Sequence, residues 1–180
     1  MYSKRWLKRS DERSRLRLRF ALGISVLLLG LCCQATDRVK ELQDHFDHDP
    51  HAGGKVKTLN KLADAQFEAA TKAGTDGDYV SVGLIFEKYR DNVHSALELL
   101  KKQEPDADRH PSNYRQLELE VRKGIREVEE TIVVVPAEVR PPLQIVRKDL
   151  IDADDALIAL LFPRRTKDPT KVPAVPEAKP

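Results

Sequence analysis

Apolar residues recur at steps of three and four along four stretches of the chain, and this periodicity restricts the fold more than any other feature. The longest row runs from Tyr79 to Leu100, roughly six turns at 3.6 residues per turn. Such spacing places the apolar side chains on one face of an α-helix. Similar rows run from Leu59 to Ala73, from Tyr114 to Val135 and from Leu143 to Leu161. The sequence therefore predicts four amphipathic helices.

Residues that end or begin helices separate these rows. Gly74 and Gly77 follow the first row, Pro105 and Pro111 flank the gap before the third, and Pro136 follows the third. Links this short place consecutive helices side by side in opposite directions. We predict an all-α fold, an up-and-down four-helix bundle over residues 56–162, with helices at about 56–73, 78–104, 112–135 and 141–162. In the first link, Asp76 or Asp78 is expected to cap the helix that follows.

Two local features bear on this prediction. The β-branched run Thr131–Val135 alone is typical of a strand, but the apolar spacing through it and the lack of a second strand favour a helix end. Gly83 and Gly124 lie inside predicted helices. We expect both to mark places where helices approach closely.

The first 35 residues have the layout of a signal peptide. Residues 1–19 hold eight basic and two acidic side chains, and residues 20–33 are free of charge. The apolar run is shorter than the roughly 20 residues of a transmembrane helix. We predict export with cleavage before Thr36, since Cys33 and Ala35 then occupy the small-residue positions of the cut site, and a periplasmic or extracellular location.

Two other interpretations of this segment remain open. Cys32 or Cys33 would carry a lipid if the run is a lipoprotein signal, and an uncleaved run would anchor the chain in the inner membrane with its C-terminal part outside the cytoplasm. The chain would contact a membrane only through this segment. After the cut the chain has no cysteine, so we expect its fold to rely on packing alone.

The segments that flank the predicted bundle differ from it in composition. Residues 36–55 are expected to form a linker rich in His and Asp with a short helix around Val39, Leu42 and Phe46. Residues 163–180 contain five prolines, five basic and two acidic side chains, which is typical of a disordered tail. Without the basic leader and tail, residues 36–162 hold 18 basic and 25 acidic side chains. The predicted bundle is therefore acidic.

The linker contains the densest group of metal-ligand side chains. His45 and His48 are one helical turn apart, and His51 follows in the loop. Imidazole and carboxylate groups bind Zn²⁺ or Cu²⁺, so a metal site would use His45, His48 and His51 with Asp44 or Asp47. The alternative is a solvated linker that happens to be rich in histidine and binds no cofactor. Both interpretations stay open at this stage.

The other clusters of charged side chains are typical of a solvated helix surface rather than of a catalytic or binding site. The last helix holds Asp149, Asp152, Asp154 and Asp155, of which Asp149, Asp152 and Asp155 are expected on its solvated face. The basic residues of the third helix alternate with Glu118, Glu120, Glu127, Glu129 and Glu130. This alternation predicts an exposed face laced with ion pairs. Nucleic-acid binding needs uncompensated positive charge, which this pattern does not supply.

The sequence favours a non-enzymatic protein of the bacterial cell envelope that binds a protein partner or a second copy of itself. No glycine-flanked nucleophile, phosphate-binding glycine loop or His-Glu-x-x-His motif occurs in the chain. The second hypothesis is an envelope metal-binding protein that uses the histidine cluster. The third is an enzyme whose site is assembled across the bundle from residues that the sequence does not pair.

Overall fold

The computed structural model describes residues 37–163, which divide into two units between Glu41 and Leu42. Of the first unit, only residues 37–41 are described, and they are helical. The predicted signal peptide and all but the first residue of the predicted tail lie outside the described residues. Residues 37–163 contain helices and no strand, so the all-α prediction is confirmed.

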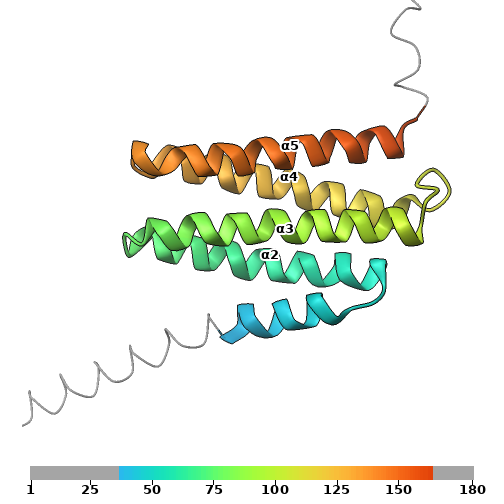
Figure 1. Ribbon diagram of the computed structural model, residues 1–180, viewed down its shortest axis with the longest axis horizontal. Coiled ribbons are helices and arrows are strands. Elements are labelled where there is room, and N and C mark those ends of the chain that lie inside the picture. The colour runs from blue at the N-terminus through green and yellow to red at the C-terminus, as the bar shows by residue number, and fades with distance from the viewer. Residues whose placement is uncertain (1–36, 164–180) are drawn as a thin grey trace, which may run out of the picture. The chain divides into compact units, whose positions relative to one another are not determined.

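Four long helices dominate the second unit (Figure 1): α2 (Ala52–Thr75), α3 (Tyr79–Gln103), α4 (Pro111–Val134) and α5 (Arg140–Leu161). A 3₁₀ turn, η1 (Ala137–Val139), leads into α5. Neighbours in sequence run in opposite directions, and α2 packs on α3, α4 on α5, α3 on α5 and α2 on α4. The α2–α3 and α4–α5 connections lie at one end of this arrangement, at the left in Figure 1. We call this the turn end.

The predicted apolar rows form the core. Phe86, Tyr89, Leu117 and Leu150 are buried, as are most other members of the four rows. The β-branched run is helical through Val134, and Val135 is buried just beyond α4. The prediction of a helix end for this run is therefore confirmed.

The first long helix begins at Ala52, four residues before its predicted start. Gly53 and Gly54 have poor helix propensity but lie in its first turn. At both positions a neighbouring side chain occupies the space that a Cβ would take, so glycine fits there. Asn113 lies against Gly53 and the Asp49 carboxylate against Gly54. The Asp49 carboxylate also accepts a hydrogen bond from the His51 backbone N–H (2.9 Å).

The segment expected to be a linker is anchored to the rest of the second unit. Phe46 is buried, and the Lys55 ammonium lies 4.7 Å from its ring centroid. The Gln43 and Asn92 side-chain amides exchange two hydrogen bonds (2.9 and 3.1 Å). Gln103 accepts from the Ala52 backbone N–H (2.8 Å). The Phe46 contact thus ties residues 42–51 to α2, and the amide contacts hold them against α3.

The two interior glycines behave differently. A Cβ at Gly124 would overlap the Tyr89 ring, so the prediction of a close helix approach is confirmed there. A Cβ at Gly83 would meet no atom within 4 Å. The prediction for Gly83 is therefore wrong, because this residue lies on an open part of α3.

Candidate functional site

The contact between α2 and α4 differs from an ordinary apolar helix contact because charged groups enter it. We call it the α2–α4 seam and define it by the side chains that meet there: Asn60, Asp64 and Phe67 of α2, and Glu120, Lys123 and Glu127 of α4.

Glu120 is the most buried acidic group of the seam, with 3% of its surface exposed. Its Oε2 atom accepts a hydrogen bond from Asn60 Nδ2 (2.9 Å), whereas its buried Oε1 atom has no hydrogen-bond partner in the described structure. The Tyr89 hydroxyl of α3 donates to its backbone carbonyl oxygen (2.9 Å). The carboxylate is therefore only half satisfied, an arrangement that costs free energy when the group is charged.

Burial raises the pKa of the Glu120 carboxyl from its ordinary value of 4.5 to about 7. The nearby Lys123 ammonium opposes this shift, while the Asp64 and Glu127 carboxylates add to it. Burial and the negative charges of Glu120 and Glu127 also raise the pKa of Tyr89 well above its ordinary value. Proton uptake by Glu120 near neutral pH follows from this environment.

Lys123 supplies the positive charge of the seam. Its ammonium pairs with Asp64 of α2 and lies 5.7 Å from the centroid of the Phe67 ring. The Phe67 ring meets Tyr89 edge-on, with 4.9 Å between centroids. The seam thus combines two packed aromatic rings, a buried carboxylate and a more exposed ion pair.

The sequence prediction for Glu120 is wrong. We expected it on the exposed face of the third helix, but it is buried because α4 packs against three helices and its buried arc is wider than one apolar row. The sequence did contain one indication of this burial, because Glu120 is next to Val121 and four residues before Gly124, and both belong to the buried row of α4. Glu118, in contrast, pairs with Arg122 one helical turn later (2.6 Å), as the predicted face of ion pairs requires.

Toward the turn end, the seam opens into a cavity of about 390 Å³. We call it the seam pocket; its lining includes Ala70, Gly74, Val82, Glu127, Glu130 and Val134. The local sequence explains the opening: the last two turns of α2 hold only alanine, glycine, threonine and one lysine, so no large apolar side chain fills the space opposite α4. The result is a mostly apolar hollow with two carboxylates.

One exposed valine lies in the lining of this hollow, and two more are close to lining residues in the sequence. Val134, which lines it, is 78% exposed, and Val133 and Val80, each next in sequence to a lining residue, are both 76% exposed. Leu84 and Ile145 are also exposed in the first half of α3 and α5, outside the lining of the pocket. Exposed apolar side chains beside a hollow are typical of interaction surfaces.

A second hollow of about 1000 Å³ lies at the opposite end, along the α3–α4 loop. Two of its charged side chains have partners nearby, since Arg109 binds Asp106 (3.0 Å) and Glu104 accepts from Asn113 of α4 (2.8 Å). The Tyr114 hydroxyl donates to the Glu104 carbonyl oxygen (2.9 Å). These contacts hold the α3–α4 loop against the start of α4.

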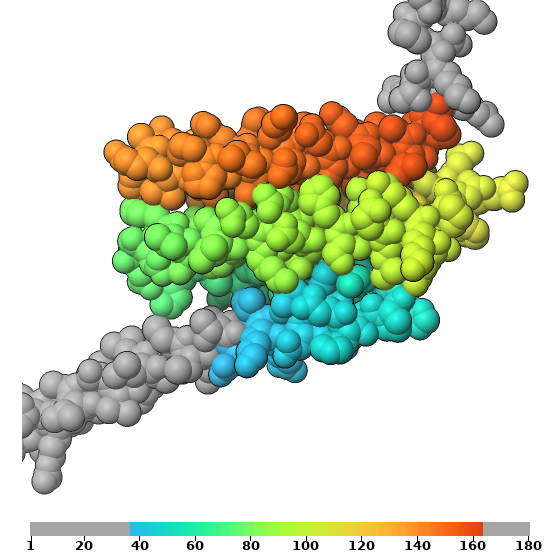
Figure 2. Space-filling view, viewed as in Figure 1, coloured from blue at the N-terminus to red at the C-terminus, as the bar shows by residue number. Residues whose placement is uncertain are grey.

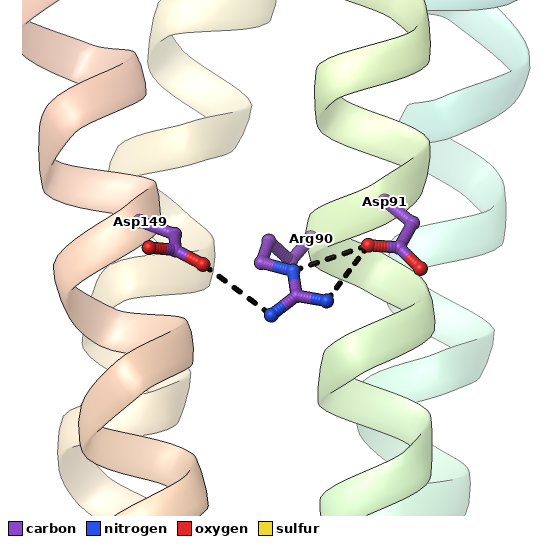
Figure 3. Close-up of polar contacts among 3 residues, drawn as sticks. All are labelled: Arg90, Asp91 and Asp149. Atoms are coloured by element: carbon purple, nitrogen blue, oxygen red, sulfur yellow. Dashed lines mark hydrogen bonds and ion pairs between the residues drawn. The ribbon is translucent and has the colours of Figure 1, made fainter.

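The contact between α3 and α5 contains a different kind of charged group. Arg90 lies between Asp91 of its own helix and Asp149 of α5 (Figure 3), at 2.9 and 3.3 Å. Asp154 of α5 likewise lies 3.5 Å from Arg122 of α4. Asp152 and Asp155 are exposed as predicted, whereas Asp149 and Asp154 join ion pairs between helices.

The structure does not gather the predicted metal ligands into one site. His45, His48 and His51 are exposed, and the His48 Nδ1 atom lies 2.7 Å from the Asp44 carbonyl oxygen. The Asp47 carboxylate accepts from Gln43 (2.9 Å). Within residues 37–163, no group of three or more His, Cys, Asp or Glu side chains is placed to hold a metal ion. The metal hypothesis stays a prediction.

Comparisons with known proteins give no family for this chain. No protein-family model matches it, and searches of curated proteins and of solved structures gave no significant match. Among the helices of the described region, none combines the length and the apolar character needed to cross a membrane.

Asp78 does cap α3 as expected, since its carboxylate accepts from the Ser81 backbone N–H (3.1 Å).

Proposed function

We propose that this chain is a non-enzymatic protein of the bacterial cell envelope that binds a segment of another protein in the seam pocket. Its scaffold is an up-and-down four-helix bundle formed by α2 to α5. Export is supported by the basic stretch and apolar run of residues 1–35. The charge of residues 36–162, with more acidic than basic side chains, argues against an anionic partner.

The observation that carries the proposal is the seam pocket with Val134 exposed at its edge. Its volume is sufficient for several small apolar side chains, and Glu127 and Glu130 favour a basic residue beside them. The partner segment therefore combines small apolar side chains with lysine or arginine.

Photo-crosslinking tests this proposal. A photoreactive phenylalanine replaces Val134 in the full chain, which is produced with its leader in a bacterial host. Leu84, an exposed leucine that does not line the pocket, takes the same replacement as the control. We expect Val134 to form an adduct with one protein whose attached peptide contains basic and small apolar residues.

The charge of the pocket provides the second arm of this experiment. Glu127→Lys and Glu130→Lys should each reduce the adduct at least fivefold, because they repel a basic segment. An adduct that forms equally from Leu84, or that survives both substitutions, would contradict a specific site at the pocket.

A further inference from the structure

The seam pocket has a complementary segment in the same chain. Residues 164–180 carry five basic and two acidic side chains, and within them Lys171 directly precedes Val172-Pro-Ala-Val175. This short run offers small apolar side chains beside a positive charge. The pocket offers Ala70, Val82 and Val134 beside Glu127 and Glu130. Size and charge therefore match on both sides.

The chain beyond α5 is also long enough to reach from the end of α5 to the seam pocket. α5 ends at Leu161, at the end of the unit opposite the pocket, and its 22 residues span about 33 Å at 1.5 Å per residue. Val172 and Val175 follow Pro163 by nine and twelve residues. At about 3.1 Å per residue, the spacing that proline-rich chains favour, they reach roughly 28 to 37 Å. A tail that returns along the bundle thus brings these valines level with the pocket.

We propose that Lys171–Val175 docks into the seam pocket of its own chain, with the two valines in the hollow and Lys171 beside Glu127 and Glu130. An external segment of the same chemistry binds by displacing it. The proposal rests on the proposed function for the use of this pocket, and it adds an internal competitor that sets the threshold for binding.

The purified full chain, with the photoreactive phenylalanine at Val134, tests the docking directly. After illumination and digestion, mass spectrometry identifies the peptide attached at Val134. We expect residues 171–175 in that peptide. Mixing unlabelled and ¹⁵N-labelled protein shows whether both halves of the adduct come from one chain. An adduct only between chains, or none with the tail, overturns the proposal.

A charge swap provides the matched variants. Glu130→Lys and Lys171→Glu should each reduce the tail adduct at least fivefold, and the double variant should recover most of it. Lys179→Glu, which lies outside the docking run, is the control and should leave the adduct within twofold. Failure of the double variant to recover would overturn the pairing of Lys171 with Glu130.

The two proposals fail in different ways. A partner adduct in cells without a tail adduct in the purified chain removes the docking and retains the proposed function. A tail adduct without any partner adduct retains the docking and removes the proposed function.

Discussion

Two contacts between helices use charged groups in opposite ways. Where α3 meets α5, Arg90 is bound by Asp91 and Asp149 (Figure 3), and all three side chains are partly exposed. In the α2–α4 seam, Glu120 is buried and one of its carboxylate oxygens has no hydrogen-bond partner. The first arrangement is screened by water and adds little to stability. The second destabilises the folded state whenever Glu120 is charged.

The difference also extends along the surface. Figure 2 shows the face on which α3 and α5 lie side by side as a closely filled surface. The seam pocket lies where α2 offers only small side chains to α4. The incompletely paired carboxylate and the adjoining hollow are the reasons for which we propose binding at this contact, since natural sites often trade stability for function.

The largest expected effect comes from Gly124→Ala. The added Cβ overlaps the Tyr89 ring, which must move and lose its hydrogen bond to the Glu120 carbonyl oxygen. We expect a loss of about 3 kcal/mol in the free energy of unfolding, measured with urea. Gly83→Ala is the control and should stabilise by about 0.5 to 1 kcal/mol, because Gly83 has open space around it. A Gly124 variant as stable as the control would refute the close contact at α4.

Glu120→Gln is expected to change the pH dependence of stability. Because the pKa of Glu120 is raised to about 7 in the folded state, that state holds its proton more tightly than the unfolded chain. The free energy of unfolding therefore falls as pH rises from about 4.5 to about 7. The neutral amide removes this fall, so the variant should gain about 2 to 3 kcal/mol over the natural protein between these pH values.

Urea unfolding at a series of pH values from 4.5 to 8 measures this gain. The groups that face Glu120 are Asn60 and Asp64 of α2, Tyr89 of α3, and Lys123 and Glu127 of α4. All of these remain in the variant. Glu130→Gln, an exposed carboxylate on the same helix, is the control. If the stability of both variants changed with pH in the same way, the pKa of Glu120 would not be raised in the folded state.

Asp149→Asn should have the smallest effect. It breaks the ion pair with Arg90, but Arg90 keeps Asp91 and water as partners. We expect a change of less than about 1 kcal/mol, reduced further in high salt. A loss comparable to that of Gly124→Ala would mean that the α3–α5 contact depends on its charges and would remove the contrast with the seam.

The periodicity of the sequence was sufficient for the helices and most of the core. The rows from Leu59, Tyr79, Tyr114 and Leu143 each became a buried face, because apolar burial at helical spacing is a local property that a sequence displays. The main error in helix bounds was at Ala52. There the space of two missing Cβ atoms is taken by Asp49 and Asn113, and helix propensity alone does not reveal such contacts.

The candidate site was much less predictable. Glu120 looks like its exposed neighbours in the sequence, and only the packing of three helices around α4 buries it. The seam pocket arises from small residues in α2 that resemble an ordinary alanine-rich helix end until α4 is placed opposite them. The histidine cluster, in contrast, is conspicuous in the sequence, yet its three imidazoles are exposed.

Filling the seam pocket tests the central claim, that this hollow is kept open for binding. Gly74 lines it, and an added Cβ meets only Val82, at 3.9 Å. Gly74→Leu should raise the free energy of unfolding by about 1 to 2 kcal/mol. It should also reduce the adduct between Val134 and the partner protein at least fivefold. A variant that gains stability and keeps the full adduct would contradict the claim.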